Sequence, residues 1–190
     1  MPRPLPRAFY HRPAIEVARA LLGTVLVHGS TSARIVETEA YLGLQDRAAH
    51  SWRGITPRTR VLFGEPGHAY VYLIYGMYEC LNVVAEPAGS PGCVLIRAVE
   101  PLEGIPLMRR RRRLGTRGIE ALANGPGKLT LALGIGRRDN GADFTKGRLT
   151  IRPATDKETV RIGVSPRIGI RHCADWPLRF FIEGNRFVSR

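Results

Sequence analysis

The apolar residues of this chain alternate with polar ones over several short segments and follow a helical spacing in only a few places. Residues 13–22 have the helical spacing, with Pro13 suited to a first turn and Gly23 to a stop. Runs rich in β-branched and aromatic residues are typical of strands. They predict strands at 24–28, 33–41, 69–74, 78–85 and 93–99.

The second half of the chain contains more helical signals. From Gly104 the pattern changes to helix, first through 107–113 and then, after a break at Gly115, through 119–123 and 129–133. A polar stretch follows at 134–147. Beyond it, short strands are predicted at 149–152, at 160–170 with a break at Ser165-Pro166, and at 178–182.

The order of these elements indicates a fold class. Antiparallel hairpins without a regular β-α-β alternation favour an α+β fold. At 190 residues, one domain is the default. We therefore expect a single domain over residues 13–190, with a curved antiparallel β-sheet, flanking helices and a protruding β-hairpin. A short basic, proline-rich arm at residues 1–12 precedes it.

Charged residues in two predicted strands are candidates for chemistry. A period of two places Glu37, Glu39 and Tyr41 on one face of the strand at 33–41. Glu39, expected to be exposed beside an arginine-rich loop, is a candidate general base that takes a proton from water; the alternative is a solvated strand glutamate. Arg97 lies in an apolar run and must find an anion. That anion is either an ion-pair partner without catalytic use, or a phosphate or catalytic carboxylate.

Four of the six tyrosines lie between residues 70 and 78. Alternation places Tyr70 and Tyr72 on one face, and Tyr75 lies beside Gly76 at a turn, where its ring should project from the tip. Aromatic rings bind bases by stacking, and side chains at such a tip can wedge between base pairs. Ordinary packing is the alternative for strand tyrosines. The long segment before this hairpin, residues 43–67, has weak periodicity, and such loops are often functional.

The charge of the chain changes this picture most. The formal net charge is +13, and because only three of the 29 basic residues are lysines, the other 26 are arginines. Arginine presents a planar fork that matches phosphate oxygens, so nucleic acid is the leading class of partner. An arginine-rich genome or a heat-adapted surface is the alternative explanation. The five arginines at 109–113 would circle a helix, which indicates a solvated helix end with some phosphate contacts.

Several classes of protein are excluded by what the sequence lacks. Cys80, Cys93 and Cys173 fit neither a disulfide framework nor a close metal-ligand pair, so they are predicted to be core thiols in a reducing compartment. The five histidines show no metal-binding spacing, and we expect no metal and no cofactor. No apolar stretch approaches the ~20 residues of a membrane span. The amino terminus lacks the features of a secretion signal, so we expect neither membrane insertion nor export.

Several blocks of the sequence together resemble one known family. The blocks are residues 34–43, 48–51, 56–58, 70–78, 93–101, 125–129 and 165–170, in that order. They are similar to the alkyladenine (3-methylpurine) DNA glycosylase family over nearly the whole chain after residue 12. One departure is that the chain is one residue shorter than its relatives between His50 and Thr56, which puts contacts from Trp52 and Arg53 in doubt.

The resemblance implies roles for individual residues. Glu39 matches the general base for the hydrolytic water, Arg97 matches an arginine that helps to hold that water and the nucleotide's phosphate, and Ile168 would offer its carbonyl to the water. The stacking pocket for a flipped base would consist of Tyr41, His50 and Tyr72, with Asn82 discriminating against the exocyclic amine of guanine. Tyr75 would fill the gap left in the duplex, flanked by Met77 and Tyr78. Backbone contacts would come from Thr56, Arg58, Lys128 and Gly169.

The resemblance also implies an activity and its partners. The expected enzyme is a monomeric, monofunctional DNA glycosylase of base excision repair, which removes alkylated, deaminated or etheno purines from double-stranded DNA. The matching active-site blocks offer no lysine for a Schiff base, so hydrolysis without strand cleavage is expected. It would work in the cytoplasm, at the nucleoid, or in a nucleus. The alternative is a non-catalytic, tRNA-binding-like module of the same fold; a structural protein of the ribosome is disfavoured by the ordered tyrosine and carboxylate blocks.

Overall fold

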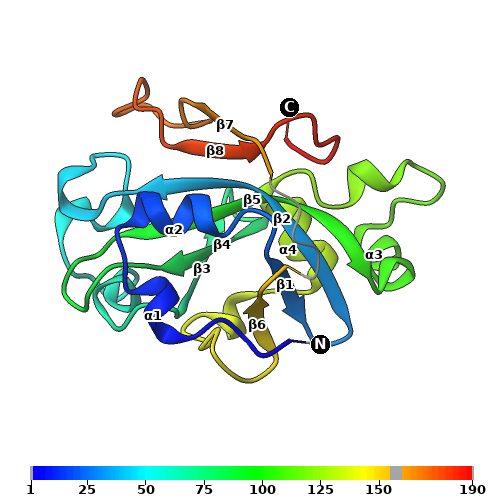
Figure 1. Cartoon of the computed structure of the whole chain (residues 1–190), viewed down its shortest axis with the longest axis horizontal. Helices are drawn as coiled ribbons and strands as arrows, with labels where there is room; N and C mark the ends of the chain where they lie inside the picture. The colour runs from blue at the N-terminus through cyan, green and yellow to red at the C-terminus, as the bar shows by residue number, and fades with distance from the viewer. Residues whose placement is uncertain (1, 155–159, 190) are drawn as a thin grey trace.

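The computed structural model of the chain describes residues 2–154 and 160–189. These residues form an α+β domain around one eight-stranded antiparallel sheet, as the sequence predicts (Figure 1). The strands are β1 (Val25–His28), β2 (Thr31–Tyr41), β3 (Ala69–Ile74), β4 (Tyr78–Val84), β5 (Cys93–Glu103), β6 (Leu149–Arg152), β7 (Ile162–Ser165) and β8 (Arg179–Ile182). The α-helices are α1 (Arg7–Tyr10), α2 (Ala14–Ala20), α3 (Ile105–Arg112) and α4 (Pro126–Leu133).

Most of the predicted elements are confirmed to within a few residues. The largest differences are that β5 continues to Glu103 and that 119–122 forms a 3₁₀ turn instead of an α-helix. The strand prediction for residues 166–170 is wrong. Pro166 has no N–H to donate to a ladder, and the segment after it lies against β2, where it takes part in the site described below.

Strand β2 occupies the centre of the sheet. Along the order β3-β4-β5-β2-β1-β6 it pairs with β5 over most of its length and with β1 at its start. At residues 37–39 it also pairs with β8, so the sheet branches there, and irregular pairing with β5 marks the same region. In Figure 1 the β7–β8 hairpin lies above β2, with β8 as the strand next to it. Residues 37–39 of β2 are therefore enclosed by strands on both sides.

The two faces of the sheet have different compositions because side chains alternate along each strand. One face carries Leu81, Val83, Val94 and Ile96, which join the main apolar core with residues of α2 and α4. The opposite face carries a smaller cluster around Tyr70 and further, more polar residues. Those residues include Glu39, Tyr41, Tyr72, Asn82 and Arg97. The sheet thus separates the stabilising core from a face on which chemistry is possible.

The amino-terminal residues do not stand apart from the domain. Leu5 is buried and its amide donates to the carbonyl of Ile151, while Tyr10 is fully buried against the main core. Residues 5 and 10 of the expected arm therefore contribute to the folded body. Within the described residues, no helix has the length and apolar character needed to cross a membrane.

Candidate active site and DNA interface

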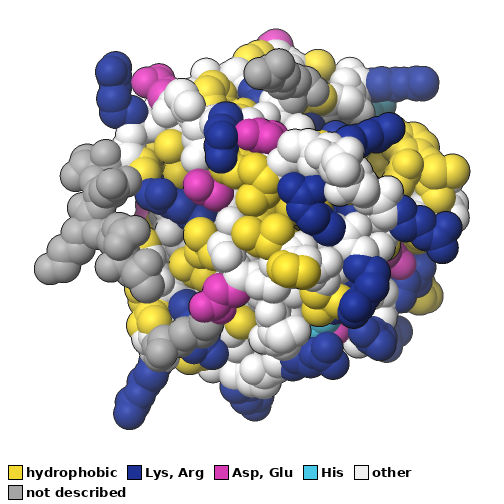
Figure 2. Space-filling view, turned by 90° about the vertical axis from the view of Figure 1, so that its right-hand side faces the viewer, with side chains coloured by type: hydrophobic (Ala, Val, Ile, Leu, Met, Phe, Trp, Pro, Cys, Tyr) yellow, Lys and Arg dark blue, Asp and Glu magenta, His cyan; other side chains and the backbone are white. Residues whose placement is uncertain are grey.

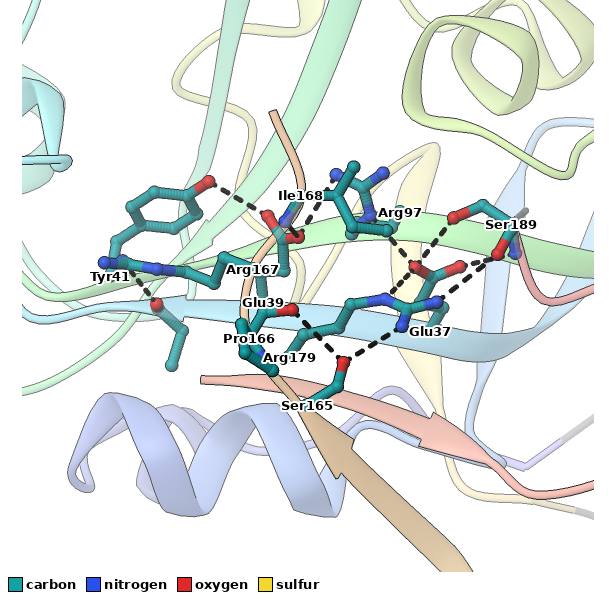
Figure 3. Close-up of polar contacts among 11 residues, drawn as sticks. Glu37, Glu39, Tyr41, Arg97, Ser165, Pro166, Arg167, Ile168, Arg179 and Ser189 are labelled. Carbon is teal, nitrogen blue, oxygen red and sulfur yellow. Dashed lines mark hydrogen bonds and ion pairs between the residues drawn. The ribbon is translucent and has the colours of Figure 1, made fainter. Parts of the chain in front are cut away.

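The carboxylate of Glu39 lies at a convergence of three different segments (Figure 3). Its Oε2 accepts the hydroxyl proton of Tyr41 at 2.9 Å, and its Oε1 accepts the backbone N–H of Ile168 at 2.8 Å. Nη1 of Arg97 lies 3.2 Å from the same Oε1. An ionised carboxylate has about four acceptor sites. One site on Oε2 therefore stays available for the proton of a water molecule.

The expectation that Glu39 is exposed is wrong. Its exposed fraction is 0%, as is that of Glu37 two residues earlier. The sequence pattern shows the carboxylates of β2 but not the strand β8 and the segment after β7, which cover them from more than 120 positions away. Burial is tolerated because Arg97 and Arg179 bring compensating charge to the same place.

The environment of Glu39 makes it a stronger base than an exposed glutamate. Burial raises the pKa of Glu39, and this effect exceeds the lowering by Arg97, by the Ile168 N–H and by the Tyr41 hydroxyl. Burial and the charge of Glu39 also raise the pKa of Tyr41 well above its usual value, so Tyr41 stays a neutral donor. A carboxylate held ready by donors but poorly solvated is suited to take a proton from water.

Arg97 finds the anion that its position requires. Its Nε donates to Oε1 of Glu37 at 3.0 Å, and its Nη1 faces Glu39, so both partners are carboxylates. Although burial alone would lower the pKa of Arg97, the charges of Glu39 and Glu37 raise it, and the guanidinium stays cationic. The sequence left open whether the anion beside Arg97 is a carboxylate or a phosphate. In the structure Arg97 forms ion pairs with two carboxylates, that of the candidate base Glu39 and that of Glu37.

Beside Glu39 the polar face of the sheet opens into a cavity of about 570 Å³, within the range of small-molecule sites. Tyr41, Arg97 and Ile168, the three partners of Glu39, all line this cavity. Aromatic rings form much of the wall. The ring centroids of His50 and Tyr72 are 4.5 Å apart, and those of Tyr70 and Tyr72 are 5.3 Å apart. The cavity therefore offers aromatic surface to a ligand directly beside the buried carboxylate.

His50 is neutral in this setting. Its Nδ1 lies 3.0 Å from the Tyr70 hydroxyl, and partial burial together with the nearby charge of Arg58 lowers the pKa of His50 to about 4. Arg58 itself lies 5.1 Å above the ring of Tyr72. His50 and Tyr72 are predicted pocket residues, whereas the sequence pattern indicates Tyr70 only as a strand tyrosine. Tyr70 is the residue that orients His50.

The inner wall of the cavity carries one amide and two thiols. Asn82 is 3% exposed, and its Nδ2 donates to the backbone carbonyl of Tyr70 at 3.1 Å, so its Oδ1 is available to a ligand. Cys80 and Cys93 also line the cavity as free, buried thiols. Burial raises the pKa of Cys93 to about 12, so this thiol is not a nucleophile at neutral pH.

The β3–β4 hairpin projects at the mouth of the cavity. Tyr75 is 79% exposed at its tip and has a φ of 53°, a left-handed conformation that tyrosine rarely adopts. Met77 and Tyr78 beside it are also exposed, and Tyr75 and Tyr78 line the cavity. Gly127 of α4 approaches Tyr78 so closely that a Cβ at this glycine would lie 2.9 Å from the tyrosine side chain. The hairpin is thus supported from behind and presents apolar groups to solvent.

The residues suggested for DNA-backbone contacts lie on the surface. Thr56, Arg58, Lys128 and Gly169 are all exposed, and Lys128 and Gly169 belong to the cavity lining. Lys128 is thus a lysine at the cavity, and its Nζ is held at 2.9 Å from the Asn124 side-chain oxygen. Within residues 2–154 and 160–189, no group of three or more His, Cys, Asp or Glu side chains could hold a metal ion.

A second ion pair, which the sequence pattern does not predict, supports the site. Arg167 is fully buried at its side chain and donates to both carboxylate oxygens of Asp46 and to the Ala40 carbonyl. Its guanidinium lies 4.6 Å from the centre of the Tyr41 ring. Since Ile168 follows directly, this anchor fixes the N–H that binds Glu39. The Ser165-Pro166-Arg167 block contained the signal, but Asp46 is too distant in sequence to be recognised as its partner.

Known proteins that are similar to this chain belong to one family. The family model described as Methylpurine-DNA glycosylase (MPG) matches residues 8–186. The chain belongs to the methylpurine-DNA glycosylase family. This membership confirms the resemblance inferred from the sequence blocks, and it covers almost the whole folded domain.

Curated relatives extend the family match over the full chain. A protein of Methanoculleus marisnigri is 51% identical over 192 residues, covering 98% of both chains, and one of Methanocella arvoryzae is 49% identical, covering 98% of this chain and 96% of its own. One of Chlorobaculum tepidum is 46% identical, covering 96% and 88%. Each carries the name "Putative 3-methyladenine DNA glycosylase".

Proposed function

We propose that this chain is a DNA glycosylase that hydrolyses the N-glycosidic bond of 3-methyladenine and other methylated purines in double-stranded DNA, and that it acts in base excision repair. Family membership and the names of the relatives support the reaction class. The observation that carries the proposal is the position of Glu39, a buried carboxylate held by three groups that also line an aromatic cavity.

The target base must leave the duplex to reach this cavity. An enzyme that acts on a base extrudes it from the stack at a cost of a few kcal/mol, least for damaged or mispaired bases. The exposed Tyr75 would enter the gap, with Met77 and Tyr78 beside it on the groove side. The extruded base would stack among Tyr41, His50 and Tyr72.

The chemistry then requires little acid catalysis. A methylated purine carries positive charge in its ring, which weakens its bond to the sugar and makes it a good leaving group. As the sugar becomes cationic, ionised Glu39 stabilises it and takes a proton from the attacking water. Arg97 holds Glu39 in place and contacts the nucleotide's phosphate, and the Ile168 carbonyl positions the water. The products are the free base and an abasic site.

Lesion choice is the finer part of the proposal. Neutral purines that have been deaminated or carry an etheno bridge would also fit the aromatic walls, since stacking does not require a charged ring. We assign discrimination among purines to Asn82, whose side chain is fixed at the inner wall by its bond to the Tyr70 carbonyl and would crowd the exocyclic amine of guanine. The backbone contacts proposed for Thr56, Arg58, Lys128 and Gly169 would hold the flanking strand.

The enzyme is proposed to be monofunctional, acting as a monomer in the cytoplasm at the nucleoid, or in a nucleus. Lys128 is the lysine at the cavity, and we assign it to phosphate rather than to a Schiff base because Asn124 holds its Nζ at the exposed rim. Borohydride should trap no covalent enzyme–DNA adduct. An adduct lost in Lys128→Gln would instead make Lys128 a nucleophile.

The decisive experiment measures base release from duplexes carrying one hypoxanthine, one ethenoadenine or random methylation. It compares the wild type with Glu39→Gln and with Glu100→Gln, a half-buried glutamate of β5 that serves as the control. We expect the wild type and the control to free methylated bases and Glu39→Gln to bind without excision, with strands breaking only after alkali. If none of the three frees a base although all bind DNA, the non-catalytic module is the correct description.

A further inference from the structure

The carboxylate next to the proposed base has its own set of partners, although it does not line the cavity. Glu37 is 0% exposed and accepts four hydrogen bonds: from Nε of Arg97 at 3.0 Å, from Nε of Arg179 at 2.7 Å, and from the backbone N–H and hydroxyl of Ser189 at 2.7 and 2.8 Å. Figure 3 shows these groups converging on Glu37 beside Glu39. A buried charge so fully bonded has a fixed position.

Glu37 determines where the charge of Arg97 is directed. The guanidinium is planar, so binding of its Nε by Glu37 fixes the plane in which the two Nη groups lie. In that plane Nη1 lies 3.2 Å from Oε1 of Glu39. The single cation is therefore shared between the two carboxylates, and Glu39 receives only part of its stabilisation.

Glu37 also connects to the second group that holds Glu39. Arg179, bound to Glu37 through Nε, donates from Nη1 to the Ser165 hydroxyl at 3.0 Å and from Nη2 to the Ser189 carbonyl at 3.3 Å. Ser165 ends β7, and three residues later the N–H of Ile168 binds Glu39. Both supports of Glu39, the guanidinium and the amide, are thus linked to Glu37.

We propose that Glu37, held by the carboxy-terminal Ser189, is a positioning residue for the hydrolytic step, which shares Arg97 with Glu39 and so keeps Glu39 both oriented and basic. This inference rests on the proposed glycosylase function. Without Glu37, Arg97 would turn its whole charge toward Glu39. A carboxylate so stabilised is a weaker base, and it would also lose its alignment with the cavity.

The test is single-turnover release of 3-methyladenine by the wild type and by Glu37→Gln, measured across pH together with affinity for the lesion duplex. In Glu37→Gln we expect the plateau rate to fall about 10- to 100-fold, as misalignment at an active site does. The acid limb of the pH–rate profile, where the rate rises with pH, should move to lower pH, because the charge of Glu37 no longer raises the pKa of Glu39. Affinity should stay unchanged, because Glu37 does not line the cavity.

Two further variants keep the result interpretable. Glu100→Gln removes a carboxylate that accepts a hydrogen bond at 3.0 Å from Asn185 of the same carboxy-terminal segment, and it should leave rate and acid limb unchanged. Ser189→Ala removes one donor of Glu37 without changing any charge. It should lower the plateau rate less than Glu37→Gln does, with the acid limb in place, even if Glu37→Gln does not fold.

The outcomes separate the proposals from each other. A wild type that releases no base overturns the proposed function itself. If the wild type is active, wild-type rates in Glu37→Gln and Ser189→Ala overturn the positioning role. Equal losses in Glu37→Gln and Glu100→Gln, with the acid limb unmoved, would also overturn it, because they would show a structural contribution alone.

Discussion

At the scale of single residues, the site depends on how a buried carboxylate can be ionised. Glu39 has no exposed surface, and burial favours its protonated form, while Arg97, the Ile168 N–H and the Tyr41 hydroxyl favour the ionised form. Burial prevails, so the pKa of Glu39 lies above its ordinary value of 4.5. The balance leaves a carboxylate that is more basic than an exposed glutamate and is held by donors beside the cavity.

This balance predicts the pH dependence of excision. With 3-methyladenine as the leaving group, which needs no protonation, the rate should rise with pH along an acid limb whose midpoint lies above pH 4.5. The free energy of unfolding changes with pH in the opposite direction to the rate. Because the pKa of Glu39 is raised in the folded state, its contribution to stability is fully present below about pH 4.5 and is lost as the pH rises through the folded pKa. Single-turnover rates over pH 4 to 8 would check the limb; a midpoint at or below 4.5 would contradict it.

The residue scale also shows how far the sequence alone reaches. Arg97 could be predicted to need an anion, because a charge in an apolar strand is costly when unpaired. The exposure of Glu39 could not be predicted, since the covering segments follow more than 120 residues later. Arg167 and Asp46 form their ion pair across 121 positions, and no local pattern connects them.

At the scale of elements, the β3–β4 hairpin combines a strained tip with a supported base. Tyr75 adopts a positive φ, which costs free energy for a non-glycine residue, although most of its side chain is exposed. Gly127 of α4 meanwhile allows close packing behind Tyr78. Strain at an exposed aromatic tip is consistent with a role toward DNA rather than toward the stability of the domain.

Replacement of the tip residue should therefore separate function from stability. In Tyr75→Gly the turn is relieved, and we expect the free energy of unfolding to stay within about 0.5 kcal/mol of wild type or to rise. Excision from duplex DNA should fall, while excision from a single strand, which has no gap to fill, should change much less. Thermal melts and parallel assays on both substrates measure this. Equal losses on the two substrates would assign Tyr75 to the pocket instead.

Two loops are held together by the Asp46–Arg167 pair, which predicts a stability effect. Asp46→Asn leaves the buried guanidinium of Arg167 without its charged partner and should lower the free energy of unfolding by about 3–5 kcal/mol. Arg167→Leu combined with Asp46→Asn should recover part of that loss. Urea denaturation of the single and double variants gives the comparison. A single variant as stable as wild type would show that the pair contributes nothing.

The strands and helices were easier to predict than the pairing of the strands in the sheet. Alternation and turn residues identified β1 to β6 and the α2, α3 and α4 helices, because those signals are local. They could not show that β2 changes its neighbour from β1 to β8 at residues 37–39, which is a property of the assembled sheet. The failure at residues 166–170 has the same origin: that segment is irregular because it binds β2 through side chains and one amide.

At the scale of the whole molecule, the basic residues behind the net charge of +13 do not all have the same role. Figure 2 shows lysine and arginine side chains across one face, most crowded toward its right-hand side. Three arginines of the run at 109–113, namely Arg109, Arg111 and Arg112, donate to backbone carbonyls of neighbouring segments. Part of the positive charge therefore stabilises the fold around the end of helix α3. Net charge alone therefore overstates the number of phosphate contacts.

Salt dependence tests which cations meet phosphate. Each neutralised phosphate adds about 0.9 to the slope of log affinity against log salt concentration. Lys128→Gln, at the cavity rim, should weaken binding to all duplexes alike and reduce the slope by about 1. Lys146→Gln removes an exposed lysine that pairs with Asp143 and does not line the cavity, and it should leave the slope unchanged. Equal slopes in all three proteins, measured by titration between low and high salt, would place the DNA backbone elsewhere on the surface.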